Sequence, residues 1–194
     1  MKKLSLALFA ISMMGIAGLA QGKADYSGTW QLDKDKSTFS GPMRVEGMTL
    51  TVAQTAKEIK VDTATKRLPP PEGAGPNAPT GAPGAPGAGP GRGMGRGFGG
   101  MGDGSVTYSL DGKELKVEMD GPNGKMPVVY KGTVEANGSL KLSNSRTFAG
   151  PMGQITMTTK ETWTLSTDGK SLTIDRENTT PRGAQTSKLV FVKG

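Results

Sequence analysis

In three segments of the sequence, the residues at every second position are apolar at one end of the segment and polar at the other. They read Leu-x-Leu-x-Asn-x-Arg over 140–146, Thr-x-Glu-x-Trp over 159–163 and Leu-x-Ile-x-Arg-x-Asn over 172–178. Alternate residues of a β-strand point to the same face of a sheet. If the three segments are neighbouring strands, one face carries an apolar core that passes at a similar depth into acidic, basic and amide side chains.

This polar cluster has the chemistry of an anion-binding site. Glu161 is expected to pair with Arg176 across strands, and Arg146 supplies a second cation on the same side. A buried charge is costly unless it is paired, and the planar guanidinium of arginine suits a carboxylate or phosphate. The candidate ligand-binding residues are therefore Asn144, Arg146, Glu161, Trp163 and Arg176.

The apolar part of such a ligand would lie against Trp163, Ile174 and Leu142. The alternative is that the polar residues form a solvated strand end. Where a strand extends beyond the core, neither face needs apolar residues, so polar residues there need not indicate a site. Exchange of either arginine for alanine, tested with an anionic fluorescent lipid, separates the two interpretations.

Composition excludes several kinds of site. The chain has no cysteine and no histidine, which removes disulfides, thiolate nucleophiles and the commonest general base and transition-metal ligand. No pairing of a nucleophile with a base is recognisable, so we expect a non-enzymatic protein without catalytic residues or a cofactor. Methionine thioethers can bind Cu(I), but no Met-x-Met spacing occurs, and no metal site is predicted.

Hairpins with glycine turns must position these residues. Asp168-Gly169 predicts a two-residue type I′ turn, in which both positions need a positive φ. The turn places Leu165 opposite Leu172, Trp163 opposite Ile174, Thr164 opposite Thr173 and Glu161 opposite Arg176. Apolar residues then meet on one face and polar residues on the other, which favours a single register.

Two further glycines predict similar hairpins. A two-residue turn at Asp111-Gly112 would place Tyr108 opposite Leu115 and Val106 opposite Val117. A three-residue loop over 136–138, with Gly138 in the left-handed region, would place Val134 opposite Leu140.

The remaining sequence shows the same alternation. Strands are expected at 27–32, 48–54, 58–65, 106–110, 115–119, 128–135, 140–148, 154–166, 171–176 and 189–193. Successive strands joined by short turns form either a closed barrel or two facing sheets, and closure removes exposed edges. The predicted fold is an all-β, antiparallel up-and-down barrel of about eight to ten strands.

Residues 26–39, Tyr-Ser-Gly-Thr-Trp-Gln-Leu-Asp-Lys-Asp-Lys-Ser-Thr-Phe, resemble the opening strand of the calycins, the group of lipocalins and fatty-acid-binding proteins. Gly28 and Trp30 match the Gly-x-Trp of that strand. The whole pattern is similar to exported bacterial lipocalin-like proteins of unassigned function. The resemblance implies a barrel with Trp30 plugging one end and a ligand in the lumen. The two-helix lid and the Arg-x-Tyr of fatty-acid-binding proteins are absent.

The N-terminus predicts export. Lys2 and Lys3 precede a mostly apolar run, so residues 1–20 read as a signal peptide, with cleavage at 20 or as late as 24. The expected location is periplasmic or secreted. No later apolar run has the roughly 20 residues of a membrane span, so no integral membrane segment is expected in the mature protein. The net charge of +7 falls to +5 without the two signal lysines.

A glycine- and proline-rich segment interrupts the pattern at 68–104, with 14 Gly and 8 Pro in 37 residues. It has too few apolar side chains to offset the entropy of ordering. We interpret it as a disordered loop within one domain spanning 25–194, and not as a linker between domains. Its Arg-Gly-Met-Gly-Arg stretch, 92–96, is too short to indicate nucleic-acid binding.

Together these patterns predict an exported, non-enzymatic lipocalin-like protein. Its expected partner is a small apolar or amphipathic ligand, anionic or uncharged, bound in the barrel lumen. The alternative is a structural or interaction module of the cell envelope with a filled core and no small-molecule ligand. The sequence does not indicate the oligomeric state.

Overall fold

The computed structural model describes residues 24–40, 45–68, 103–121, 124–150 and 153–194. Ten strands account for most of them. The first five are β1 (Gly28–Thr38), β2 (Val45–Gln54), β3 (Glu58–Arg67), β4 (Gly104–Ser109) and β5 (Asp111–Gly121). The others are β6 (Gly124–Val134), β7 (Leu140–Gly150), β8 (Gly153–Leu165), β9 (Ser171–Thr180) and β10 (Gly183–Lys193).

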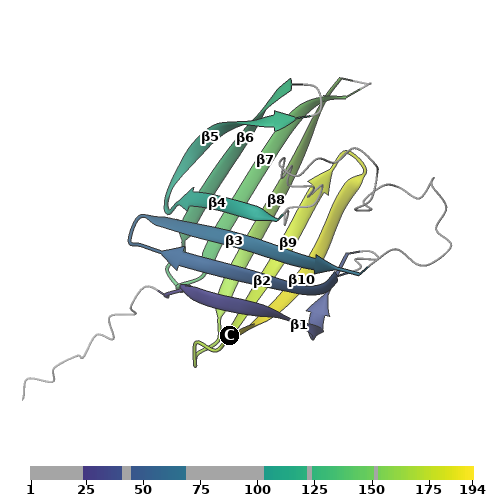
Figure 1. Cartoon of the computed structure of the whole chain (residues 1–194). Helices are drawn as coiled ribbons and strands as arrows, with labels where there is room; N and C mark the ends of the chain where they lie inside the picture. The colour runs from purple at the N-terminus through teal and green to yellow at the C-terminus, as the bar shows by residue number, and fades with distance from the viewer. Residues whose placement is uncertain (1–23, 41–44, 69–102, 122–123, 151–152) are drawn as a thin grey trace, which may run out of the picture.

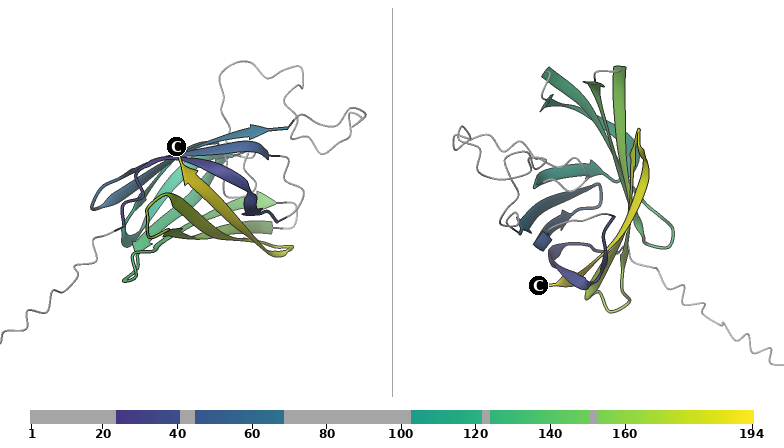
Figure 2. Two further views of the ribbon diagram at one scale, coloured as in Figure 1. Left: turned by 90° about the horizontal axis from the view of Figure 1, so that it is seen from below. Right: turned by 90° about the vertical axis from the view of Figure 1, so that its right-hand side faces the viewer.

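The ten strands form one antiparallel sheet in the order β4-β3-β2-β1-β10-β9-β8-β7-β6-β5. The first and last strands pair, because Leu32 lies opposite Phe191. The edge strand β4 packs against β5 and β6, so the sheet is nearly closed. Figures 1 and 2 show β1–β4 crossing over the face of β6–β10. The architecture is the all-β, antiparallel up-and-down barrel that the sequence predicts.

The register of the β8–β9 hairpin agrees with the prediction at all four pairs, from Leu165 opposite Leu172 to Glu161 opposite Arg176. The turn type was predicted wrongly. Gly169 has a φ of 66°, but no described residue other than glycine has a positive φ, so Asp168 does not adopt a type I′ conformation. Its carboxylate instead accepts hydrogen bonds from the Ser166 hydroxyl and the Lys170 amide, in a longer loop that keeps the same register.

The β6–β7 connection forms as predicted. Val134 lies opposite Leu140, and Gly138 has a φ of 82°. The Gly138 amide donates to the Glu135 carbonyl at 3.0 Å. The Asn137 side chain accepts from the Ser139 amide at 3.0 Å, which fastens the loop beneath the core.

The hairpin predicted at Asp111-Gly112 is wrong. Tyr108 lies opposite Ile59 in β3, and Leu115 lies opposite Tyr130 in β6. The chain turns a corner here because β4 continues to follow β3, with the Leu110 amide donating to the Lys57 carbonyl at 2.7 Å. An Asp-Gly pair therefore marks the seam where the sheet edges meet instead of a hairpin.

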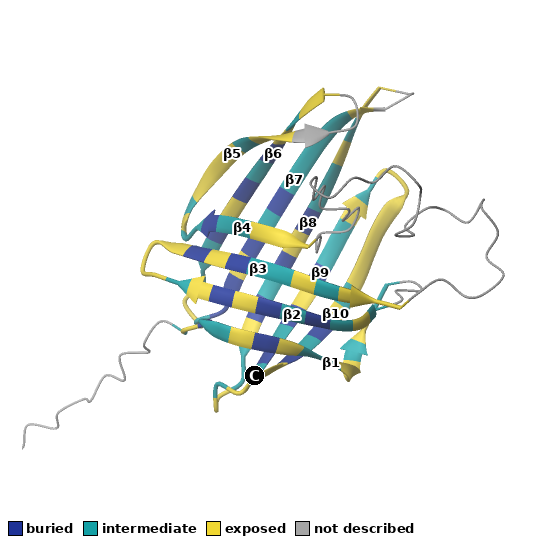
Figure 3. Ribbon diagram, in the orientation of Figure 1, coloured by how far each residue is buried: buried dark blue, intermediate teal, exposed yellow. Residues whose placement is uncertain are grey.

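The core fills the region where β1–β3 cross β6–β10 (Figure 3). Its largest fully buried side chains include Trp30, Trp163, Tyr26, Phe191, Leu50 and Ile59. Trp30 is fully buried, and its indole donates to the Tyr26 carbonyl at 2.9 Å. The Tyr26 hydroxyl lies 2.9 Å from the Trp163 carbonyl oxygen, to which it can donate. Tyr26, which precedes β1, is thus packed into the core beside Trp30 and Trp163.

Two sequence predictions fall outside the described residues. They are the signal peptide at 1–20 and nearly all of the glycine- and proline-rich segment, at 69–102. The flanking strands β3 and β4 are direct neighbours, with Thr63 opposite Gly104. No helix in the described part of the chain is long and apolar enough to cross a membrane.

Candidate functional site

The structure brings the predicted polar residues together on the inner face of the barrel. One cross-strand row runs through Tyr130, Asn144, Thr159 and Asn178. Glu161 and Arg176 lie opposite each other in the next row toward the core, where Leu142 also faces Glu161. The alternation in three separate strands therefore predicted correctly that these residues lie close together on one face.

A buried ion pair forms the floor of the cluster. Arg176 donates to Glu161 Oε1 through Nε at 2.9 Å and through Nη2 at 2.6 Å. The other carboxylate oxygen accepts from the Trp163 indole at 2.7 Å. The two charged side chains are only 2% and 7% exposed, so each depends on the other for compensation. Trp163 is equally buried, and these three side chains make a packed polar layer.

Tyr108 was not predicted as part of the site. It comes from β4, and its ring packs edge-on against Tyr130 with 5.4 Å between centroids. Burial raises the pKa of Tyr108, the Glu161 charge raises that pKa further, and a hydrogen bond with Asn144 lowers it. Tyr108 therefore places a neutral phenol over the cluster. The alternation of apolar residues around Tyr108 indicated that its side chain points inward. Its contact with β6 lies between strands that no hairpin joins, so no turn sequence indicated it.

Arg146 lies one row farther from the core than Asn144. Its neighbours across the strands are Val128 and Met157, and it is half-buried. Its charge acts on Tyr130, whose pKa is raised by burial and lowered to a smaller extent by Arg146. Arg146 therefore lies on the inner face, level with the buried Val128. Figure 1 shows that β5–β8 extend beyond β4.

On β5 the inner face is apolar, and two of its described side chains are exposed. Leu115 is 42% exposed and Met119 is 40% exposed, although both point to the same face as the core. Val117, Met126 and Met157 on this face are half-buried. The Tyr130 hydroxyl lies 3.5 Å from the Met119 sulfur. Along the inside of β5–β8, the row of Tyr130 and Asn144 is followed by the row of Val128 and Arg146 and then by the apolar pair of Met119 and Met126.

All three tyrosines of the chain have a raised pKa. Burial raises the pKa of Tyr26 to about 12, and burial is also the main cause for Tyr108 and Tyr130. At pH 10, half of the tyrosines ionise in an unfolded chain. We expect the folded protein to show far less tyrosinate absorbance at that pH than the same protein in urea.

The linked effect on stability has a defined sign. Between about pH 10 and 12 the unfolded chain loses tyrosine protons that the folded chain retains, so ionisation stabilises the unfolded state. The free energy of unfolding should fall across this window and not below it, as urea titrations at successive pH values would measure. Normal titration near pH 10 in the folded protein would contradict the burial of these rings.

The described residues show no metal centre. No group of three or more acidic, histidine or cysteine side chains gathers in this part of the chain. The expected absence of a cofactor stays a prediction. What the inner-face residues can offer a ligand is hydrogen bonding from Asn144 and Tyr108, the charge of Arg146 and the apolar surface of β5.

No family model and no curated protein matches the sequence. Among solved structures, the chain is similar to zebrafish ileal bile acid-binding protein complexed with cholic acid. The two share 13% sequence identity with a TM-score of 0.44, and the similarity covers 87% of this chain and 98% of that one.

Proposed function

We propose that the protein binds a small amphipathic ligand with one anionic group on the inner face of the barrel, without catalysing a reaction. The proposal is carried by the succession of surfaces beyond β4. Arg146 shares a cross-strand row with Val117 and Val128, and the exposed side chains of Leu115 and Met119 lie one row to either side of it on β5. A ligand with an anionic end and an apolar body could satisfy both.

The ligand's anion belongs beside Arg146 and not beside Arg176. Arg176 is almost fully buried, whereas Arg146 is only half-buried. In the proposal, Glu161, Arg176 and Trp163 form a packed floor on the core side of the row that contains Asn144. The phenol of Tyr108 and the amide of Asn144 contribute hydrogen bonds, and Met119 and Leu115 contact the ligand's apolar body.

A dansylated undecanoic acid tests this assignment, with an uncharged dansylated undecylamine as the matched probe. Arg146→Gln should raise the Kd of the acid at least about tenfold, because a hydrogen bond to a charged group contributes about 1.5–3 kcal/mol. The uncharged probe should bind the variant and the natural protein alike. Arg182→Gln, in an exposed turn, controls for the loss of one positive charge.

The outcomes separate the proposal from its alternative. Equal weakening of both probes by Arg146→Gln would assign Arg146 a structural role. Failure of both probes to bind the natural protein would favour the structural module of the envelope, for which the tightly packed layer of Glu161, Arg176 and Trp163 is the supporting observation.

Export is the second part of the proposal. The basic start, the short apolar run and the small residues near position 20 support a signal peptide that directs the chain to the periplasm or the medium. Fractionation of the cells, with the mass of the recovered protein, tests it. An unprocessed protein in the cytoplasm would contradict it.

A further inference from the structure

The strand β5 has a backbone edge that no described strand covers. β5 pairs with β6 on one side only, and it ends the sheet. The other edge strand, β4, is six residues long and pairs with β3. The carbonyl of Ser109, at the end of β4, faces Gly132 of β6. Most of β5 therefore extends beyond β4, as Figure 1 shows.

Both faces of this edge strand are accessible. Leu115 and Met119 are two of the four large apolar side chains that are exposed among the described residues. Glu114, Lys116 and Glu118 are exposed on the opposite face. An edge of this length, with free amide and carbonyl groups, is a template for adding another strand.

The charge pattern of β5 is complementary to itself. If two copies pair antiparallel with Val117 opposite Val117, Lys116 lies opposite Glu118 on both sides of the axis. Leu115 then lies opposite Met119 on the inner face, also twice. Opposite charges and apolar pairs in direct cross-strand register both stabilise a sheet.

Neighbouring registers match less well. Centring the pair on Lys116 opposes that lysine to itself and Glu114 to Glu118. Centring it on Leu115 keeps two Glu114–Lys116 pairs but opposes the charged Lys113 to Val117, where the favoured register opposes Leu115 to Met119. The favoured register has one unfavourable pair, Glu114 with Asp120, at each end of the paired segment, where the exposed Glu114 side chain is well screened by solvent.

We propose that β5 is a dimerisation edge, at which two copies of this chain pair antiparallel about Val117. The symmetry makes the interface isologous, so both copies use the same residues. The sheet becomes continuous across two barrels, and the exposed apolar inner faces of both β5 strands meet. The inference does not depend on ligand binding.

Sedimentation velocity of the mature chain tests the proposal. Because an interface of one strand pair is small and therefore weak, concentrations from roughly 1 to 500 µM are needed, and a monomer–dimer equilibrium is expected. Lys116→Glu or Glu118→Lys should each raise the dimer Kd about tenfold or more, since symmetry places two like-charged pairs in the interface. The double exchange should restore dimerisation.

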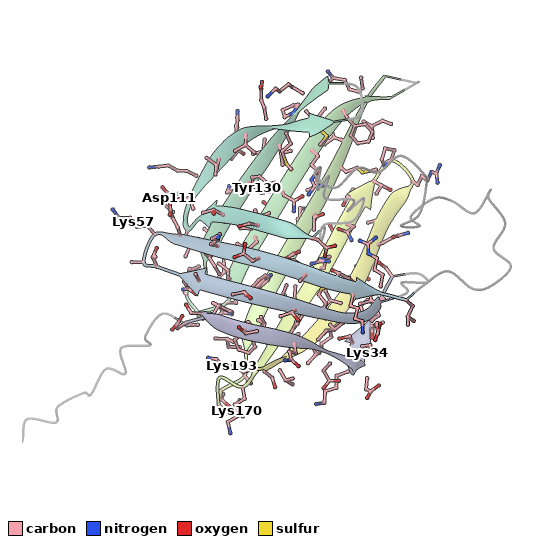
Figure 4. All side chains as sticks on the ribbon, viewed as in Figure 1. Lys34, Lys57, Asp111, Tyr130, Lys170 and Lys193 are labelled. Atoms are coloured by element: carbon pink, nitrogen blue, oxygen red, sulfur yellow. The ribbon has the colours of Figure 1, made fainter. Side chains whose placement is uncertain are left out.

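A matched control makes the same charge change elsewhere. Lys170→Glu lies in the β8–β9 loop, away from β5 (Figure 4), and should leave the Kd unchanged. Since the chain has no cysteine, Val117→Cys labels the axis alone and should give covalent dimers with a short bis-maleimide. Lys170→Cys measures collisional crosslinking.

A chain that stays monomeric throughout this concentration range overturns the proposal. This outcome is also the one expected if the edge of β5 binds a different protein. A dimer that is indifferent to both charge exchanges, or that Val117→Cys does not crosslink, uses a different surface and overturns it equally. Circular dichroism confirms that each variant is folded.

Discussion

Replacing Glu161 with leucine should lower the free energy of unfolding by about 3–5 kcal/mol. The substitution leaves the Arg176 guanidinium buried without its carboxylate, and that side chain is 2% exposed. It also removes the acceptor of the Trp163 indole, 2.7 Å away. Desolvation of the cation dominates, because the remaining groups of this layer cannot neutralise a full charge.

A double-mutant cycle distinguishes an unpaired charge from lost packing. Arg176→Met alone should also destabilise the protein, because it isolates the buried carboxylate. The combination of Glu161→Leu with Arg176→Met should cost much less than the sum of the two single exchanges, since a buried pair replaced by apolar side chains is often close to neutral. Urea unfolding measures all three. Additive losses would show that the charges do not depend on each other.

An exposed ion pair provides the control. Lys66 and Glu46 approach to 2.6 Å, as close as Arg176 and Glu161, but their side chains are 73% and 41% exposed. Glu46→Leu should change stability by no more than about 1 kcal/mol. The contrast isolates burial as the cause. A similar loss at both sites would contradict the argument.

The sequence predicted the strands and most of their pairing because both are local. Alternation identifies the inner face, and the loops at Gly138 and Gly169 set the register of two hairpins. The Glu161–Arg176 pair follows directly from the second hairpin. The turn around Gly169 differed from the prediction without changing the register, because the longer loop keeps the same residues opposite each other.

The contacts across the seam could not be predicted in the same way. Tyr108 reaches Tyr130 only because the sheet curves until β4 lies against β6. That contact is between strands that share no ladder, so neither periodicity nor turn chemistry specifies it. The Asp-Gly signal even pointed to the wrong partner strand. The binding roles of Asn144, Arg146, Glu161, Trp163 and Arg176 stay predictions, although their placement is established.

Gly132 determines how closely the seam can close. A Cβ at this position would lie 2.7 Å from the Ser109 carbonyl oxygen and 3.2 Å from both Tyr108 Cβ and Leu142 Cδ2. The nearest atom belongs to the backbone of β4, so no change of side-chain rotamer can relieve the contact. Gly132→Ala should therefore lower the free energy of unfolding by about 1–3 kcal/mol, as expected for overpacking.

The same exchange at Gly47 should have the opposite sign. No atom lies within 4 Å of a Cβ built there, and alanine in a strand loses less conformational entropy on folding than glycine, by roughly 0.5–1 kcal/mol. Gly132→Ala should also move β4 away from β6, so the amides of β4 should exchange faster and the pKa of Tyr108 should fall as its burial decreases. Stabilisation by Gly132→Ala, with unchanged exchange in β4, would mean that the two strands are not in contact in solution.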